Sequence, residues 1–509
     1  MAEQTLKEQL FHEILMARQR VYHVRQATPL QAVDLGVGAE VFIKREDLPP
    51  INAYKWRGAY NRIATLSQQQ RDKGILAASA GNHAQGVAVA VKLLGLQATI
   101  YMPRPTPRMK LNAVKKLGED HVQIKLVGDT YDQAAQACLE QSQSQGLAFV
   151  HPYDDIVTMG GQGTIADEIV MSGQGPFDMA FLQIGGGGMC AAVACWLKLH
   201  YPKIKIIGVE GEDQASMAAA VRAGKPVPLD RLDIFCDGTA VRKAGTLTHA
   251  LCSELVDEFI TVSNQQVNRA IHLFWDTRRR ILEPSGAIGI AGICSNLEKI
   301  QGKRILAVAT GANMDFSQLA VIGANSGSIG TTRKHVRFKI NEQSGSLLTL
   351  LEQTLSEINI TDFQYGKVNE KTAWPVLGFD ASPDEFKKLH QTLNAHQVEY
   401  QDISSHADVD YRIISYDSKL FRSPWFIQLQ FPERAGALRE CLAMIQGVAN
   451  ICYFNYRYSG ERIGRVLVGF EFNDNLGQEK LKTRLDNHPR FAKAYQPVLK
   501  ETLERILQK

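Results

Sequence analysis

Short apolar runs alternate with helix-like stretches between residues 40 and 316 of the chain. "GILAAS" (74–79) and "QATIYM" (97–102) are such runs, and "HAQGVAVAVKLLG" (83–95) between them has the length and final glycine of a helix. Runs that are apolar throughout predict strands covered on both faces, which are typical of parallel sheets. The alternation therefore predicts an α/β domain with parallel or mixed sheets, which we place at residues 1–320.

The pattern changes after residue 320. A segment rich in Gly, Ser and Thr (321–334) predicts a linker, and an internal repeat follows it. The order of apolar runs and turns predicts two α+β modules of the ferredoxin-like βαββαβ type, at residues 335–410 and 424–509. The two copies align without a gap at a constant spacing of 91 positions, which pairs Glu342 with Glu433, Gly345 with Gly436, Leu347 with Leu438, Phe363 with Phe454, Tyr365 with Tyr456, and Gly378 with Gly469.

Composition and charge narrow the class of protein. The 57 basic and 53 acidic residues leave a net charge of +4 without a long run of one sign, which argues against a nucleic-acid partner. The eight cysteines are scattered and form no C-x-x-C pair, which predicts free thiols in a reducing compartment and no metal site. Because neither a secretory signal nor a charge-free membrane span is visible, we expect a cytoplasmic protein without a membrane partner.

Three polar or glycine-bearing loops follow predicted strands: "SAGNHAQG" (79–86), "GGGGM" (185–189) and "TGAN" (310–313). The carboxyl ends of strands are where open α/β sheets bind ligands. Four consecutive glycines between a strand and a helix predict a phosphate cradle, because main-chain N–H groups can converge there on an anion. A merely tight or flexible turn is the alternative. The sequence patterns of nucleoside triphosphate and dinucleotide sites are missing.

The stretch "INAYKWRGAY" (51–60) places Lys55 between two aromatic residues. A single lysine is usually a solvated surface residue. A phosphate loop and a lysine without a metal cluster nevertheless indicate pyridoxal 5'-phosphate, whose aldehyde reacts with a lysine amine.

The chain resembles the fold-type II family of pyridoxal-phosphate enzymes, through six motifs in that family's order: "AYKWRGAY", "SAGNHAQGVA", "GGGGM", "DGTAVRKAG", "EPSGA" and "ATGANMDF". The resemblance implies that Lys55 forms the Schiff base with the cofactor and, once freed, takes the α-proton of the substrate. It also implies that Asn82 contacts the ring oxygen, that Thr310 faces the ring nitrogen where a serine is usual, and that the phosphate is held by Gly185, Gly186, Gly187, Gly188 and Met189.

The substrate side of the site follows from the same resemblance. Ser79, Asn82 and His83 fall in the loop that is similar to the substrate-carboxylate clamp of the family, although His83 could simply cap a helix. Ala80 stands where related racemases have a serine acid/base, which disfavours racemisation. Glu283 in "EPSGA" either lines the cofactor ring or only precedes a helix.

Further departures bear on reaction type and pocket shape. A hydroxyl at Thr310 cannot stabilise a pyridinium as a carboxylate would, and the weaker electron sink suits β-elimination better than transamination. Ala53 and Trp56 depart from the usual lysine motif, and we expect them to affect substrate preference rather than reaction class.

Within this family the chain is similar to the biosynthetic threonine dehydratases over nearly its whole length. The resemblance implies dehydration and deamination of L-threonine to 2-oxobutanoate and ammonia, the first step of isoleucine biosynthesis. It further implies inhibition by isoleucine, opposition by valine through paired ACT-like modules, and a homotetramer.

Several alternatives stay open at this point. The catalytic domain could belong to a dehydratase with broader serine/threonine specificity or to another β-elimination or β-replacement enzyme. The whole chain could be an amino-acid sensor with an inactive catalytic domain, although Lys55 and the unbroken glycine loop argue against this. The repeat could also serve only as an oligomer interface.

Overall fold

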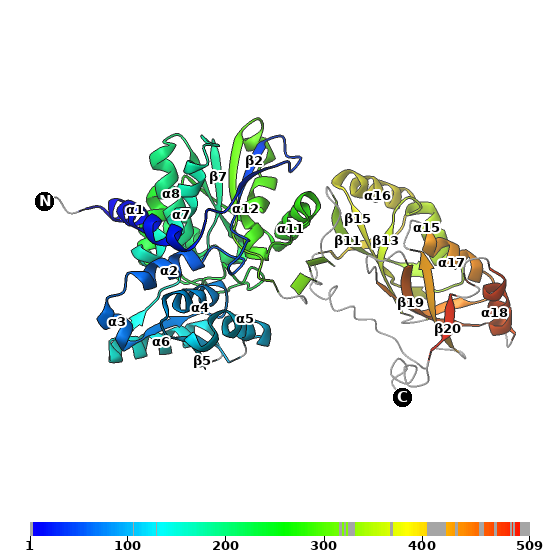
Figure 1. Cartoon of the computed structure of the whole chain (residues 1–509). Coiled ribbons are helices and arrows are strands. Elements are labelled where there is room, and N and C mark those ends of the chain that lie inside the picture. Colours follow the sequence, from blue (N-terminus) through cyan, green and yellow to red (C-terminus); the bar gives the residue numbers. More distant parts are fainter. Residues whose placement is uncertain are drawn as a thin grey trace. The chain divides into compact units, whose positions relative to one another are not determined.

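The computed structural model describes residues 4–104, 106–128, 130–314, 318–319, 322–323, 331–366, 370–404, 424–432, 436–457, 463–472, 476–488, 491 and 494–498. The chain divides into two compact units, Met1–Gly323 and Ala324–Lys509 (Figure 1). The first unit contains a six-stranded and a four-stranded sheet, and the second contains an eight-stranded sheet.

The six-stranded sheet forms the larger lobe of the first unit. Its strands are parallel except for the antiparallel edge strand β1, in the order β1 (Leu30–Val33), β2 (Glu40–Arg45), β10 (Arg304–Ala309), β7 (Met179–Gln183), β8 (Lys205–Gly211), β9 (Glu258–Val262). Both faces are covered, because Ala180 and Leu182 of β7 pack in one apolar cluster while Met179 and Phe181 pack in another. This double coverage explains why the strand is apolar throughout.

Helices enclose this sheet from both sides. One side carries α1 (Leu6–Val24), α7 (Ile156–Met171), α8 (Gly188–His200) and α10 (Thr246–Leu255), and the other carries α11 (Asn264–Arg278) and α12 (Pro284–Cys294). The short helices α9 (Ser216–Ala223) and α13 (Leu297–Ile300) complete the lobe. None of the helices in the described part of the chain combines the length and apolar character that a membrane span needs.

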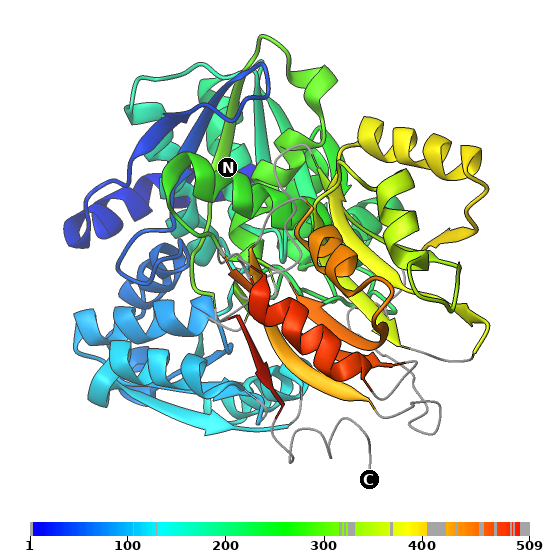
Figure 2. The same ribbon diagram turned by 90° about the vertical axis from the view of Figure 1, so that its right-hand side faces the viewer.

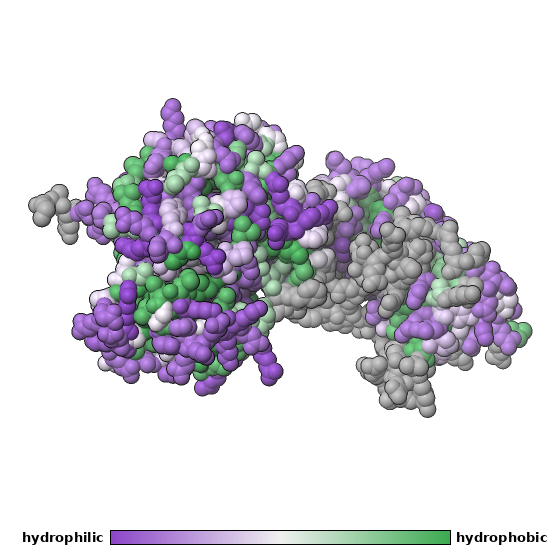
Figure 3. All heavy atoms as spheres, viewed as in Figure 1, coloured by the Kyte–Doolittle hydropathy of each residue, from purple (hydrophilic) through white to green (hydrophobic). Residues whose placement is uncertain are grey.

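The smaller lobe is built on a fully parallel four-stranded sheet. Its order is β5 (Val122–Leu126), β4 (Ala98–Met102), β3 (Ile75–Ala78), β6 (Ala148–Phe149), and its helices are α2 (Trp56–Ala64), α3 (Gln68–Lys73), α4 (Asn82–Leu94), α5 (Arg108–Gly118) and α6 (Tyr131–Gln145). Helix α4 ends at Gly95, which adopts a left-handed φ of +64°, as expected for a glycine that terminates a helix. Hydrophilic residues cover much of the viewed face of this unit, and apolar residues gather mainly between its two lobes (Figure 3).

The second unit is an antiparallel sheet covered by helices on one face (Figure 2). Its strand order is β16 (Tyr400–Asp402), β11 (Thr332–Phe338), β15 (Val376–Ala381), β13 (Ile360–Gly366), β18 (Asn450–Arg457), β19 (Ile463–Glu471), β17 (Trp425–Pro432), β20 (Tyr495–Pro497). The helices are α15 (Ser346–Thr354), α16 (Pro383–Ala395), α17 (Ala437–Ile445) and α18 (Gly477–Asn487), and β12 (Ile340–Asn341) pairs with β14 (Thr372–Ala373). The predicted fold class, an α/β domain followed by ferredoxin-like modules, is confirmed.

The repeat is built around a local twofold axis. The modules join through the equivalent strands β13 and β18, where Gln364 lies opposite Asn455. These two residues are 91 positions apart, so each is paired with its own repeat equivalent. Gly345 and Gly436, which precede α15 and α17, both have left-handed φ values of +94° and +81°. The identical glycines therefore start the two helices in the same way.

The first predicted boundary of the repeat shifts in the structure. Strand β11 begins at Thr332, so the first module starts before residue 335 and takes in the end of the predicted linker 321–334. The register of β11 against β15 explains the shift, since Thr332 pairs with Ala381. Residues 324–330 of the linker and the predicted end of the module at residue 410 lie outside the described residues.

A buried ion cluster joins the two lobes at the start of α2. The fully buried guanidinium of Arg57 donates to both oxygens of Glu46 at 2.8 Å, and to those of Glu168 at 2.6 and 3.0 Å. Lys44 donates to Glu168 at 2.5 Å. Two cations and two carboxylates thus compensate one another. Burial lowers the pKa of Lys44, whereas Arg57 and Lys44 outweigh burial and hold the pKa of Glu168 below its usual value.

The cluster yields a stability prediction. We expect Arg57→Met to lower the free energy of unfolding of the cofactor-free protein by about 3–5 kcal/mol, because it leaves two buried carboxylates without their main partner. Urea denaturation measures the loss. Arg62→Met on the same helix is the matched control, since Arg62 is partly exposed and its nitrogen lies 3.6 Å from Asp155. That control should cost at most about 1 kcal/mol, and equal losses in both variants would contradict the prediction.

Candidate active site

Loops after the carboxyl ends of several strands surround a cavity of about 510 Å³, which includes its solvent-open part. The cavity is lined by Tyr54, Lys55, Asn82, Pro152, Tyr153, Gln183, Gly185, Gly186, Gly187, Gly188, Met189, Cys190, Gly238, Thr239, Val241, Glu283, Ser285 and Thr310. The structure therefore places the predicted lysine, glycine loop, Asn82 and Thr310 around one space. Ser79 and His83 are not among the lining residues.

Main-chain contacts bring Lys55 to this space. Tyr54 N donates to Thr310 O at 3.2 Å, and Ala312 N donates to Asn52 O at 2.8 Å, so the lysine stretch runs beside the loop after β10. Helix α4 approaches the same stretch closely at Gly86, where a Cβ atom would lie 3.0 Å from Trp56 Cα. A larger residue at position 86 would displace α2 from α4, and with it Lys55 from Asn82.

The Lys55 amine is the nucleophilic group of the cavity. Its Nζ donates to the carbonyl oxygen of Gly238 at 3.2 Å. Burial lowers the pKa of Lys55 below its usual range, although the nearby Glu283 and Asp237 carboxylates oppose this effect. A lowered pKa increases the fraction of neutral amine, which is the form that attacks an aldehyde.

The glycine loop fits the phosphate of pyridoxal phosphate. A Cβ atom at Gly186 would lie 2.2 Å from the Tyr153 ring, and one at Gly188 would lie 2.7 Å from Tyr153 O. Side chains are thus excluded where main-chain N–H groups precede α8, and the positive end of that helix dipole favours an anion. The Thr248 hydroxyl beside Gly187 is buried and has no partner among the described residues, so a further hydroxyl donor is free there.

Asn82 belongs to a hydrogen-bonded group opposite the glycine loop. Its Nδ2 donates to Glu283 at 2.7 Å, and its Oδ1 accepts from Asn313 Nδ2 at 2.8 Å. One hydrogen of Nδ2 therefore remains for a ring oxygen in the cavity. Asn313 N also donates to Glu283, at 3.0 Å. The Asn82 side chain is fixed from both ends.

Glu283 is a cavity residue. Although it immediately precedes α12, its side chain makes no capping hydrogen bond to that helix. Burial raises the pKa of Glu283 to about 7, assisted by the Asp237 carboxylate and opposed by Asn82, Lys55 and Asn313. The sequence left two roles open for Glu283, and the geometry favours a role in lining the cavity over one that only precedes the helix. A carboxyl group with such a pKa can exchange a proton near neutral pH.

Two side chains of the predicted substrate loop, those of Ser79 and His83, form hydrogen bonds with main-chain groups. His83 Nε2 donates to Val150 O at 2.9 Å, and burial lowers the pKa of the imidazole to about 3, so the ring is neutral. Ser79 Oγ accepts from Gly81 N at 3.2 Å. A role for Ser79 and His83 in substrate binding stays a prediction, and the geometry gives His83 a structural contact instead of a catalytic one.

Several lining residues had no role assigned from the sequence. Gly238 and Thr239 belong to the motif "DGTAVRKAG", which carried the resemblance without pointing to a particular atom. Tyr153 packs on the glycine loop but lies in no motif, so nothing local marks it. Gln183 is a polar residue at the end of an apolar strand, and that was the available signal.

Comparison with known proteins gives the family. The model of the "Pyridoxal-phosphate dependent enzyme" family matches residues 22–311, and that of the "C-terminal regulatory domain of Threonine dehydratase" matches residues 326–413 and 423–494. Biosynthetic L-threonine dehydratase from Pasteurella multocida is 36% identical over 467 residues, covering 89% of this chain and 90% of that protein. The Escherichia coli enzyme is 35% identical over 481 residues, or 92% of each chain.

Solved structures agree with the sequence relatives. The processed form of threonine deaminase isoform 2 from Solanum lycopersicum aligns with a TM-score of 0.59 and 42% identity, covering 62% of this chain and 92% of that one. Maize serine racemase aligns with a TM-score of 0.57 and 30% identity, covering 60% and 94%. The resemblance drawn from the six motifs is confirmed, and the chain belongs to the pyridoxal-phosphate-dependent enzymes and, within them, to the biosynthetic threonine dehydratase family.

Proposed function

We propose that this chain converts L-threonine to 2-oxobutanoate and ammonia, the first step of isoleucine biosynthesis, with pyridoxal phosphate held at Lys55. The observation that carries the proposal is the juxtaposition of a lysine amine of lowered pKa and an all-glycine phosphate cradle in one cavity. Family membership over both units supports the same activity.

The proposed chemistry divides between the cofactor and the protein. Bound pyridoxal phosphate supplies the electron sink for the charge left when the α-proton is removed. Lys55 takes that proton and returns it to the β-hydroxyl, which leaves as water. Hydrolysis of the resulting enamine releases 2-oxobutanoate and ammonia. Ala80 carries no group that could return a proton to the α-carbon, which supports elimination over racemisation.

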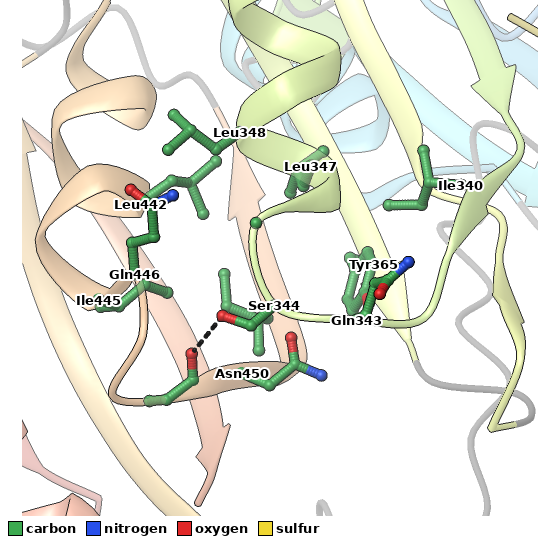
Figure 4. Close-up of a pocket in the computed structure, with 13 residues that line it drawn as sticks. Ile340, Gln343, Ser344, Leu347, Leu348, Tyr365, Leu442, Ile445, Gln446 and Asn450 are labelled. Carbon is green, nitrogen blue, oxygen red and sulfur yellow. Dashed lines mark hydrogen bonds between the residues drawn. The ribbon is translucent and has the colours of Figure 1, made fainter.

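The second unit offers a pocket for a small effector between its modules (Figure 4). Leu347 and Leu348 of α15 face Leu442 and Ile445 of α17 across this pocket. The volume of the pocket is about 390 Å³, which includes the part that is open to solvent. Polar groups stand at the edge of this pocket, from Gln343, Ser344, Tyr365, Gln446 and Asn450. Apolar walls suit a branched side chain, and the polar edge suits the charged ends of an amino acid. Isoleucine as inhibitor and valine as its antagonist are the effectors that we propose.

The remaining expectations concern assembly and location. We propose a homotetramer in the cytoplasm. The scattered cysteines, which form no C-x-x-C pair, support a reducing compartment.

Replacing the lysine tests the cofactor assignment. Lys55→Ala should remove the visible absorption band of the purified holoenzyme and lower turnover at least about a thousandfold, because both the covalent link and the base are lost. The assay measures 2-oxoacid formation from threonine and, separately, from serine, which distinguishes a threonine enzyme from one of broader specificity. Lys92→Ala on the exposed part of α4 is the control. A Lys55 variant that kept both band and turnover would sink the assignment.

A single methyl group tests the phosphate cradle. Gly186→Ala should raise the dissociation constant of pyridoxal phosphate at least about tenfold, because the new Cβ would collide with the Tyr153 ring. Fluorescence titration of cofactor-free protein measures the constant. The control is Gly323→Ala, where no atom of the described residues lies within 4 Å of the added Cβ. Equal affinities in both variants would show that the loop does not hold the phosphate.

Filling the pocket of the second unit tests the regulation. Ile445→Trp should raise the isoleucine concentration for half inhibition at least about tenfold, because the indole would occupy the space between the helices. Met444→Trp is the matched control, since this neighbouring side chain lines a separate surface groove. The two variants are compared in the threonine assay over a range of isoleucine concentrations. Unchanged sensitivity in Ile445→Trp would place the effector elsewhere.

A further inference from the structure

A buried glutamine stands at the end of the strand that leads into the glycine loop. Strand β7 is buried along its whole length, and Gln183 is its only polar residue, with 4% of its surface exposed. Burying an amide costs free energy unless its groups are hydrogen-bonded. The neighbouring strand β10 runs parallel, with Ala307 beside Phe181, so Gln183 lies next to the residues that follow β10. One of these is Thr310, which is 3% exposed.

The direction of the hydrogen bonds between these residues is determined by a main-chain carbonyl. Gln183 Nε2 lies 2.9 Å from Val308 O and 2.7 Å from Thr310 Oγ1, while Ser285 O is farther away at 3.4 Å. A carbonyl oxygen can only accept, so the amide must present its nitrogen on this side. The two hydrogens of Nε2 then serve the two short contacts. Gln183 therefore donates to the Thr310 hydroxyl oxygen.

This donation leaves the hydrogen of the Thr310 hydroxyl for another acceptor. A hydroxyl has a single hydrogen, and it cannot be directed at a group that is itself donating. The protein acceptor found for it is Ser285 O, at a long 3.4 Å. Thr310 also lines the cofactor cavity, so its hydrogen is available to a better-placed acceptor there.

We propose that Gln183 fixes the Thr310 hydroxyl as a hydrogen-bond donor to the pyridine nitrogen of the cofactor and thereby keeps that nitrogen unprotonated. The inference rests on the proposed function, which places the cofactor ring against Thr310. Gln183 is a positioning residue, because it acts through Thr310. A ring nitrogen that accepts a hydrogen bond carries no proton, and the weaker electron sink that results favours elimination over transamination.

The test is the protonation state of the ring nitrogen in the resting holoenzyme. Protein loaded with pyridoxal phosphate labelled with ¹⁵N in the ring is observed by NMR, where the signal moves upfield on protonation. The wild type should show an unprotonated nitrogen. In Gln183→Glu the carboxylate would accept the hydrogen of the Thr310 hydroxyl. The hydroxyl oxygen of Thr310 would then direct a lone pair toward the ring nitrogen. The nitrogen should then gain a proton, and its signal should move upfield.

A matched control separates hydrogen-bond direction from charge. Gln85→Glu introduces the same buried carboxylate on α4, where Gln85 accepts from Asn313 at 3.3 Å and no bond to Thr310 is present among the described residues. The ¹⁵N chemical shift of the ring nitrogen in this variant should equal that in the wild type. A protonated nitrogen in the wild type, or equal shifts in both glutamate variants, would overturn the proposal.

An uncharged variant keeps the proposal testable if the buried glutamate prevents folding. Gln183→Met removes the donor at similar volume and should raise the dissociation constant of the cofactor about threefold to tenfold, as for the loss of one hydrogen bond. Thr310→Val should do the same, whereas Thr310→Ser should retain wild-type affinity. Unchanged affinity in Gln183→Met would overturn the proposal. Because these measurements use no substrate, they hold whichever amino acid is consumed, and turnover on threonine tests the proposed function separately.

Discussion

The compensation of the Arg57 charge is the constraint on which the geometry of the site depends. A guanidinium cannot remain buried without carboxylates around it, and here they come from Glu46, just after β2, and from Glu168 of α7. Lys55 already has helical backbone angles and precedes Arg57 by two positions. Side chains at that spacing on a helix point about 200° apart, so holding Arg57 in the protein interior turns Lys55 the other way, toward the cavity. The ion cluster thus orients the reactive amine without touching it.

Two buried lysines in the first unit, Lys44 and Lys55, have different roles because their surroundings differ. Lys44 donates to the Glu168 carboxylate at 2.5 Å and also to a main-chain carbonyl of Thr28, and these bonds hold it in place. Among the described residues, Lys55 donates only to the Gly238 carbonyl, at 3.2 Å. Burial lowers the pKa of both amines. Lys55 borders the active-site cavity, so its neutral form can react, while Lys44 is held by its bonds to Glu168 and Thr28.

The sequence allowed predictions wherever function depended on local pattern. Strand ends followed by "GGGGM" and "TGAN" could be recognised because parallel strands bring such loops to one edge of a sheet. The spacing of 91 revealed the repeat, since identical glycines begin equivalent helices. What could not be predicted depends on residues distant in sequence. The bonds that join Gln183 to Thr310 and Glu283 to Asn82 exist only after strands and lobes have packed, and the start of β11 is set by its pairing with β15.

The two modules of the second unit share one fold but differ in many of their side chains. Phe363 and its repeat equivalent Phe454 meet edge to face at the axis, with ring centroids 4.7 Å apart. Away from the axis the copies diverge, since Gln446 at the pocket edge corresponds to Leu355 in the other copy. The aromatic pair at the axis is thus identical in the two copies, whereas pocket residues such as Ile445 and Gln446 differ from their repeat equivalents. A pocket between such modules has two chemically different sides, and this asymmetry supports binding of an asymmetric ligand such as a single amino acid in one orientation.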